Sequence, residues 1–176
     1  MESAVLLCVP EAEELVGPWR DKADPSAGAG VPAHVTLMTP FLPVDRLDDG
    51  VVAELEWFFA GVDAFRVRFD RVGEFPEQGV VHLSPEDGAL DDLAAALARR
   101  WPEAPPYAGR VDAPTAHLTA VRSDDAGLRE QAARALADGL PLEATVAKAA
   151  LWVYDEDGRW SESHTFAFGV AEQPDL

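Results

Sequence analysis

Apolar and polar residues follow two different periods along this chain of 176 residues. In the stretch FRVRFDRVGEF (65–75) the apolar residues Phe65, Val67 and Phe69 alternate with the polar residues Arg66, Arg68 and Asp70, which is typical of a strand with one buried and one exposed face. In ALDDLAAALARRW (89–101) the apolar residues recur at helical spacing until Pro102 follows, which indicates an amphipathic helix. Both kinds of secondary structure are therefore predicted.

The same two patterns predict the remaining elements. A short helix is expected after the first strand, ending before Pro18, and residues 24–32 form a Gly/Pro-rich loop. Residues 140–160 fit either one long strand or a bent pair of strands. Further strands are expected at 4–10, 34–38, 79–85, 117–121 and 163–170, and further helices at 47–62 and 127–140.

The order of these elements repeats once. Each half runs from a strand with the pattern His-x-Thr through a helix, an alternating strand and a turn to a final strand. The histidines follow the same repeat, since 48 positions separate His34 from His82 and 47 separate His117 from His164. The repeat predicts internal duplication.

We therefore predict an α+β fold in a single domain over 1–176. Its two lobes, roughly 30–88 and 112–172, are each expected to hold an antiparallel sheet flanked by helices. A pseudo-twofold axis would relate the lobes and place a groove between them.

Composition narrows the class of protein. With 48% hydrophobic residues the chain can bury a sizeable core. No apolar run approaches the roughly 20 residues that cross a bilayer, and the first residues, MESAVLLCVPEAEEL, place an acid where a signal peptide carries Lys or Arg. A single cysteine, Cys8, fits a reducing compartment. These features predict a cytoplasmic protein that makes no contact with a membrane, and a monomer is expected.

The charge of the chain restricts its partners. There are 32 acidic and 14 basic residues, which gives a formal net charge of -18. A long nucleic acid is repelled by such a protein as a whole. A small nucleotide, or an RNA end, remains a possible partner because a cleft with local arginines can differ in sign from the overall field.

Two short motifs carry the candidate chemistry. PAHVTLM (32–38) and PTAHLTA (114–120) both contain Ala-His-x-Thr within an apolar run. On a strand, residues i and i+2 project to the same side, so each motif presents one imidazole and one hydroxyl together. The candidate catalytic residues are His34, Thr36, His117 and Thr119.

Two imidazoles and two hydroxyls in one groove suit the opening of a cyclic phosphate. One histidine can take a proton from water, the other can protonate the departing ribose oxygen, and the threonines can stabilise charge on the nonbridging oxygens. The alternative is that these histidines pack in the core. A third match, His82-x-Ser84, shows how short the pattern is, but only the first two occupy equivalent points of the repeat.

Other residues of the groove are predicted from their place beside the motifs. Phe41 and Tyr107 lie in neighbouring loops and either stack a base or anchor a turn. Arg110 and Arg122 flank the second motif and either bind phosphate or lie in solvent. Burial is expected for four tryptophans, Trp57, Trp101, Trp152 and Trp160.

Four segments together carry a resemblance to a known family: VPAHVTLMTPFLP, FRVRFDRVGEFP, VVHLSP and PPYAGRVDAPTAHLTAV. They resemble the 2H phosphoesterase superfamily, in particular its branch of bacterial 2′-5′ RNA ligase and RNA 2′,3′-cyclic phosphodiesterase-like proteins. The resemblance implies a bilobal α+β duplication with one His-x-Thr motif from each lobe in a central groove. It gives no catalytic role to His82 or His164, for which we expect packing at the surface or at the groove edge.

The resulting hypothesis is a phosphoesterase that hydrolyses a cyclic phosphodiester without a metal. No His-x-x-x-His spacing occurs, so neither a metal site nor a cofactor is predicted. Two alternatives stay open: a nucleotide-binding sensor or regulatory module on the same fold, and a ligase that joins RNA ends through a 2′-5′ bond. The net negative charge argues against the second, because long RNA needs a basic track.

Overall fold

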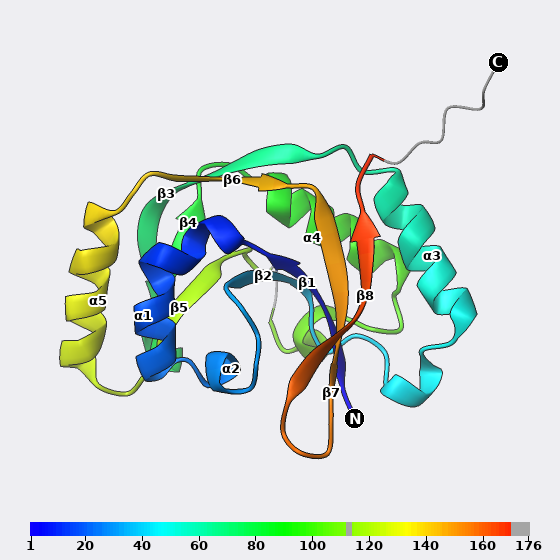
Figure 1. Cartoon of the computed structure of the whole chain (residues 1–176), viewed down its shortest axis with the longest axis horizontal. Coiled ribbons are helices and arrows are strands. Elements are labelled where there is room, and N and C mark those ends of the chain that lie inside the picture. The colour runs from blue at the N-terminus through cyan, green and yellow to red at the C-terminus, as the bar shows by residue number, and fades with distance from the viewer. Residues whose placement is uncertain (112–113, 170–176) are drawn as a thin grey trace.

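A single antiparallel sheet forms the centre of the molecule in the computed structural model, which describes residues 1–111 and 114–169 (Figure 1). Within these residues the sheet has eight strands in the order β6-β3-β4-β5-β2-β1-β7-β8. The strands are β1 (Ser3–Cys8), β2 (His34–Met38), β3 (Phe65–Phe75), β4 (Val80–Pro85), β5 (Leu118–Arg122), β6 (Leu142–Val146), β7 (Lys148–Tyr154) and β8 (Trp160–Ala167).

Helices pack against this sheet. They are α1 (Glu13–Ala23), α2 (Pro25–Gly28), α3 (Asp49–Ala60), α4 (Ala89–Arg100) and α5 (Ala126–Asp138), with short 3-10 turns at Pro10–Ala12, Val44–Arg46, Pro76–Gln78 and Pro106–Gly109. At one end of the molecule α1 and α5 lie side by side, where α1 packs against β5 and α5 against β3 and β4 (Figure 1). Towards the other end α4 packs against β2 and α3 against β8.

The helix ends follow from local sequence. Asp48 and Asp125 accept hydrogen bonds from the backbone N–H groups of Val51 and Leu128, which caps the start of α3 and of α5. The helix α1 runs through Pro18 and does not stop before it, contrary to the sequence prediction. Proline removes one helical hydrogen bond, but the buried residues Val16 and Arg20 keep the inner face of α1 in contact with the protein on both sides of it.

The two strands that carry the motifs lie side by side at the middle of the sheet. β2 and β5 are antiparallel neighbours, with Val35 opposite Leu118. Both of these side chains belong to the main core, where they are 1% and 0% exposed. Because side chains alternate along a strand, the histidines and threonines of the motifs project from the other face. The core therefore fixes the face of the sheet on which the motifs lie.

The continuous sheet corrects the prediction of two separate sheets. Residues 30–88 contribute β2 to one half of the sheet and β3 and β4 to the other, so these boundaries do not divide it. The first strand causes this arrangement, because β1 inserts between β2 and β7 with Val5 opposite Leu151. The described residues do not include 112–113 and 170–176. The predicted second lobe (112–172) and the predicted final strand (163–170) extend into these ranges. The internal duplication stays a prediction.

Several local predictions can be compared with the structure. The segment 140–160 is a pair of strands, β6 and β7, at different places in the sheet. Trp101 and Trp152 are buried as predicted, but Trp57 is 73% exposed. Leu55 and Phe59 form the buried face of α3, and Trp57, two residues from each, points to the opposite side.

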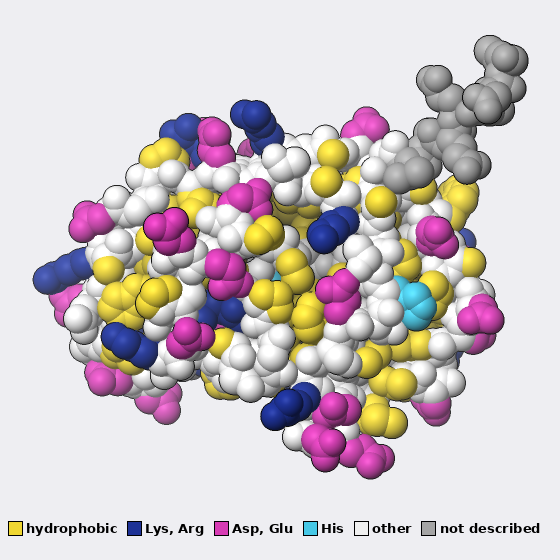
Figure 2. All heavy atoms as spheres, in the orientation of Figure 1, with side chains coloured by type: hydrophobic (Ala, Val, Ile, Leu, Met, Phe, Trp, Pro, Cys, Tyr) yellow, Lys and Arg dark blue, Asp and Glu magenta, His cyan; other side chains and the backbone are white. Residues whose placement is uncertain are grey.

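The surface carries charges of both signs. Figure 2 shows acidic side chains scattered over the whole visible face, with basic side chains between them. Within the described part of the chain, no helix has the length and apolar character needed to span a membrane.

Candidate active site

All four motif side chains line one pocket of about 820 Å³ on the open face of the central strands. His34 and Thr36 enter it from β2, and His117 and Thr119 enter it from the start of β5. Each of the four is half-buried. A pocket of this size can enclose a nucleotide.

The strand register sets how the four side chains are arranged. Since Val35 lies opposite Leu118 in an antiparallel pair, His34 falls opposite Thr119 and Thr36 falls opposite His117. The two histidines therefore occupy one diagonal and the two threonines the other. In a regular sheet the Cβ atoms of such a diagonal pair are about 7 Å apart, which leaves room for one phosphate between the rings.

The same hydrogen bond holds both imidazole rings. Nδ1 of His34 donates to the backbone carbonyl of Pro32 at 2.8 Å, and Nδ1 of His117 donates to that of Thr115 at 2.7 Å. A proton fixed on Nδ1 leaves Nε2 as the nitrogen that exchanges protons. The two motifs thus present equivalent reactive atoms.

Burial decides the resting charge of these histidines. Desolvation lowers the pKa of His34, and the hydrogen bond to Pro32 partly opposes this. For His117, desolvation again lowers the pKa, the bond to Thr115 raises it, and the positive charge of Arg122 lowers it further. Both rings are therefore predominantly neutral at pH 7.

His82 on β4 is 5% exposed and packs next to His117, which agrees with the expected packing at the groove edge and not with a place at the surface. Its ring centroid lies 5.1 Å from that of His117 and 4.4 Å from that of Phe75, and Ser84 contacts its Nδ1 at 3.2 Å. Burial, followed by the charge of His117, lowers the pKa of His82 to about 4. His82 is thus a neutral ring that packs against His117. His164 on β8 is exposed.

Two of the four predicted binding residues reach the pocket. Tyr107 and Arg122 line it. Phe41 does not, because it is 4% exposed and packs edge-to-face on Trp101 with ring centroids 5.5 Å apart. Arg110 is exposed and does not line the pocket either. The predictions for Phe41 and Arg110 are therefore corrected: the first anchors the core and the second lies in solvent.

The pocket also contains residues that the sequence did not single out for it. Phe75 and Gln78 line it at the end of β3, and Tyr154 and Trp160 line it from the β7–β8 hairpin. The rings of this second pair lie 5.2 Å apart. Trp160 is half-buried and faces the pocket, so its expected place in the core is also corrected. Regular alternation would place Phe75 on the core face with Phe69, and only the irregularity between Phe69 and Arg71 brings it to the pocket face. The sequence pattern therefore carries no signal for Phe75 or for the hairpin.

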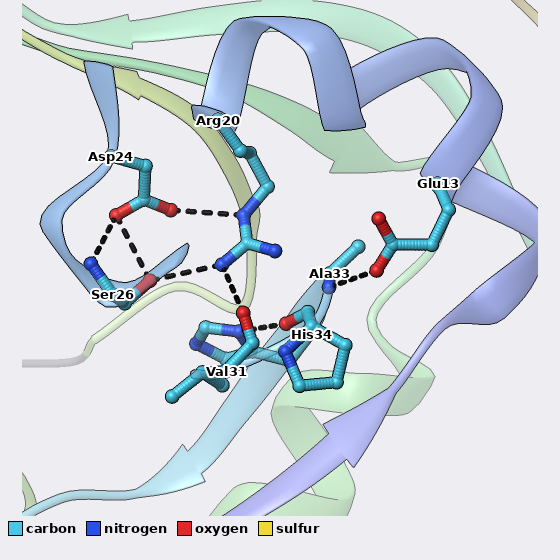
Figure 3. A network of polar contacts seen from close by, with 8 residues as sticks. Glu13, Arg20, Asp24, Ser26, Val31, Ala33 and His34 are labelled. Carbon is cyan, nitrogen blue, oxygen red and sulfur yellow. Dashed lines mark hydrogen bonds and ion pairs between the residues drawn. The ribbon is translucent and has the colours of Figure 1, made fainter. Parts of the chain in front are cut away.

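A buried polar network shapes the wall beside His34 (Figure 3). Arg20, which is 2% exposed, donates from Nε to Asp24 at 2.9 Å and from one terminal nitrogen to Ser26 Oγ at 3.0 Å and to the carbonyl of Val31 at 2.8 Å. Asp24 in turn accepts from the backbone and hydroxyl of Ser26. Asp24 and Ser26 line the pocket, so this network fixes the loop that precedes the first motif.

A metal site does not emerge from the described residues. Among residues 1–111 and 114–169, no three His, Cys, Asp or Glu side chains gather in a way that could hold a metal ion.

Comparison with known proteins identifies the family. The model of the 2′-5′ RNA ligase superfamily matches residues 8–158. The chain belongs to this superfamily, whose members are 2H phosphoesterases. No curated protein shows significant sequence similarity to the chain.

Several solved structures have the same fold as this chain. One is E. coli LigT complexed with NADP⁺, which has a TM-score of 0.60 at 18% identity, with coverage of 95% of this chain and 96% of that chain. The crystal structure of a phosphoesterase has a TM-score of 0.60 at 18% identity, with coverage of 95% of this chain and 97% of that chain. The protein TT0787 of Thermus thermophilus has a TM-score of 0.61 at 19% identity, with coverage of 96% and 98%. At these identities the likeness establishes the fold.

Proposed function

We propose that the protein hydrolyses a cyclic phosphodiester, the 2′,3′-cyclic phosphate of a nucleotide or of an RNA end, without a metal ion. The observation that carries this proposal is the diagonal pair His34 and His117, which line one pocket and are both held through Nδ1. Two general acid–base groups on either side of one phosphate are what this reaction requires.

The reaction assigns one role to each histidine. The Nε2 of one neutral histidine takes a proton from water as the water oxygen attacks phosphorus. The other histidine, protonated at the start, gives its Nε2 proton to the ribose oxygen as the bond from phosphorus to that oxygen breaks. The product is a 2′- or 3′-monophosphate, and proton exchange with solvent restores both rings. The hydroxyls of Thr36 and Thr119 and the guanidinium of Arg122 face the nonbridging oxygens.

Small nucleotides or RNA ends are the proposed substrates. E. coli LigT has been crystallised with 3′-AMP and with ATP, which supports a nucleotide in the corresponding pocket of this fold. Tyr107 and Phe75 line the pocket, where they offer aromatic faces to a base, and Phe75 packs beside His117. The net charge of -18 and the dispersed charges of the visible face in Figure 2 argue against a long RNA partner.

A panel of candidate substrates tests this proposal. Purified protein is incubated, with and without EDTA, with the four 2′,3′-cyclic mononucleotides and with short RNAs that end in a cyclic phosphate, and products are separated by chromatography. We expect a monophosphate from at least one substrate, in equal amounts with the chelator. His117→Ala is the inactive control and His164→Ala, on the exposed strand β8, is the active one. Turnover that survives in His117→Ala would count against the two-histidine reaction.

A second candidate function is the joining of RNA ends through a 2′-5′ bond, which the name of the matched family favours. Joining follows the same course as hydrolysis, with the 5′-hydroxyl of a second ribose in place of water: its oxygen attacks phosphorus as it loses its proton, and the bond from phosphorus to the 3′ oxygen breaks as that oxygen takes up a proton. It predicts that an RNA with a cyclic end and a second RNA with a free 5′-hydroxyl give a longer product on a gel. If cyclic nucleotides bind tightly but neither hydrolysis nor joining occurs, the site serves a nucleotide sensor instead.

A further inference from the structure

The peptide group that joins the two residues before each motif histidine is hydrogen-bonded at both of its ends. In the first motif the group is Pro32–Ala33: its carbonyl accepts from Nδ1 of His34 at 2.8 Å, and its N–H donates to Oε1 of Glu13 at 2.5 Å (Figure 3). A carboxylate, a peptide and an imidazole therefore form one continuous hydrogen-bonded chain.

The second motif contains the same chain, built from different residues. The peptide group is Thr115–Ala116, whose carbonyl accepts from Nδ1 of His117 at 2.7 Å and whose N–H donates to Oδ1 of Asp91 at 2.6 Å. The two carboxylates have no common sequence motif, and they lie 20 and 25 residues from their respective alanines. The arrangement thus occurs twice although its sequence does not repeat.

Both carboxylates come from the first turn of a helix. Glu13 begins α1, which packs against β5, and Asp91 lies in the first turn of α4, which packs against β2. Each helix thus packs against the strand of one motif and holds the peptide that precedes the other. The first turn is also the part of a helix where its dipole favours a negative side chain.

Hydrogen bonds in such a chain strengthen one another. A carboxylate that accepts from a peptide N–H draws electron density toward the carbonyl oxygen of the same peptide, which then accepts more strongly from the imidazole. The effect resembles that of a carboxylate or carbonyl behind a metal-bound histidine, which fixes the tautomer and makes the other nitrogen more basic.

We propose that Glu13 and Asp91 are positioning residues that act, each through one peptide group, on Nδ1 of His34 and of His117. They keep the proton on Nδ1, turn Nε2 toward the pocket and stabilise the imidazolium that forms during proton transfer. The site therefore contains two carboxylates that never touch the substrate. The effect on turnover rests on the proposed function, whereas the effect on the tautomer and the pKa of each histidine does not.

Desolvation, hydrogen bonds and nearby charges together set the pKa of each ring. The bond to Pro32 raises the pKa of His34, Asp24 raises it as well, and Arg20 and His117 lower it, while desolvation is the largest influence. Desolvation lowers the pKa of His117 most, the bond to Thr115 raises it, Arg122 lowers it and Asp91 raises it. The neighbouring ring of His82 is neutral because its own pKa is lowered. In both sites the hydrogen bond to the peptide carbonyl thus counteracts the effect of burial, and at His117 the charge of Asp91 adds to it.

A purely structural role gives a different expectation. Ala33 is 0% and Ala116 is 7% exposed, so their N–H groups need an acceptor whether or not the histidines react. The amide variants Glu13→Gln and Asp91→Asn keep an oxygen acceptor and remove only the charge. A structural role predicts no change in the histidines of these variants, whereas the proposed role predicts a specific one.

Nitrogen-15 NMR of the histidine rings is the direct test, carried out on the whole protein without substrate. The matched controls are Glu14→Gln and Asp92→Asn, because each control residue is exposed and adjacent to a proposed positioning residue. We expect Glu13→Gln to lower the pKa of His34 and to increase the fraction of its ring protonated at Nε2, and Asp91→Asn to do so for His117. Each variant should affect mainly its own histidine, and the controls should match the wild type.

Kinetics on the substrate found by the panel adds a second readout. We expect each amide variant to reduce kcat by about 10-fold with little change in KM, as outer partners of ligating histidines do. If the panel yields no substrate, the proposed function fails, but the NMR titration still decides the present inference. Histidine tautomers and pKa values equal to those of the controls would overturn it.

The wild-type protein alone also tests the inference. Both His34 and His117 must carry the Nδ1 proton in their neutral forms. Nitrogen shifts that show the Nε2-protonated tautomer for both rings would refute the proposal even if none of the variants folds.

Discussion

The surroundings of His34 and His117 differ, although equivalent hydrogen bonds hold the two rings. Beside His34 lies the buried ion pair of Arg20 and Asp24, which orders the loop before the motif. Beside His117 lie Phe75 and the neutral ring of His82. The comparison teaches that the motif reproduces the reacting atoms, whereas the neighbouring elements make the two halves of the pocket chemically distinct.

This difference has a consequence for the substrate. On the His117 side Phe75 packs against the ring and the cation Arg122 lowers its pKa, whereas on the His34 side Asp24 raises the pKa of the ring. A phosphate with a bound base fits the first side, and hydroxyl or amino donors of a nucleotide fit the second. A cyclic phosphate between the two rings would therefore bind in one preferred direction.

Removal of either imidazole is expected to have the largest effect. His34→Ala and His117→Ala should each reduce kcat by about 100-fold or more, because each loses one proton-transfer group. The double variant should lose little beyond the worse single variant, since the two rings act in one step. Steady-state rates of the three variants measure this. Strictly multiplicative losses would indicate that the histidines act independently.

The ion pair on the His34 side should matter mainly for stability. Arg20→Ala leaves Asp24 buried without its partner and is expected to reduce the free energy of unfolding by about 3 to 5 kcal/mol. Urea unfolding measures the loss. The matched control is Arg134→Ala, which breaks the exposed pair with Glu130 and should cost about 0.5 kcal/mol or less. Similar losses in both variants would show that burial of the first pair adds nothing.

On the His117 side, His82 should make the stability of the protein depend on pH. The pKa of His82 in the folded protein is lowered to about 4 from the ordinary 6.5, so between these pH values the unfolded chain binds more protons. The contribution of neutral His82 to the free energy of unfolding is complete above pH 6.5 and is lost as the pH falls toward 4. This contribution amounts to about 2 to 3 kcal/mol.

Replacement of His82 tests this sign. His82→Phe keeps a ring of similar shape but cannot titrate, so its free energy of unfolding should fall less than that of the wild type between about pH 7 and pH 4.5. Unfolding curves at the two pH values measure the difference. An identical pH dependence in both proteins would mean that His82 is not the group responsible.

The smallest expected effect concerns the two arginines that flank the second motif. Arg122→Ala should raise the pKa of His117, because a positive charge that lowers it is removed. It should also raise KM by roughly 10-fold through the loss of one phosphate contact. Arg110→Ala, which lies outside the pocket, should leave KM and the His117 titration unchanged. Equal effects of the two substitutions would contradict the placement of Arg122.

Sequence patterns predicted the elements better than their arrangement. The predicted strand over 65–75 is β3 with the same bounds, and the helical pattern over 89–101 is α4, Ala89–Arg100. Aromatic residues in turns and helices were less predictable, since Phe41, expected in the groove, is buried in the core, and Trp57, expected in the core, is 73% exposed. Burial of a single aromatic residue depends on which neighbours reach it, and no local pattern encodes them.

The candidate site shows the same limit. His34 and Thr36 could be paired from the sequence because a period of two holds along any strand. Glu13 and Asp91 could not, because each meets its backbone N–H only after a helix packs across the sheet. His82 belongs to the same group, since its contact with His117 exists because β4 pairs with β5.

The sequence by itself determined which side chains share a face within each motif, because backbone geometry repeats every two residues along a strand. Only the tertiary structure decided that the two faces meet in one pocket, because that depends on the pairing of β2 with β5. Val35 and Leu118, 83 residues apart in the chain, are brought together by burial in a common core, and burial is a property of the whole fold.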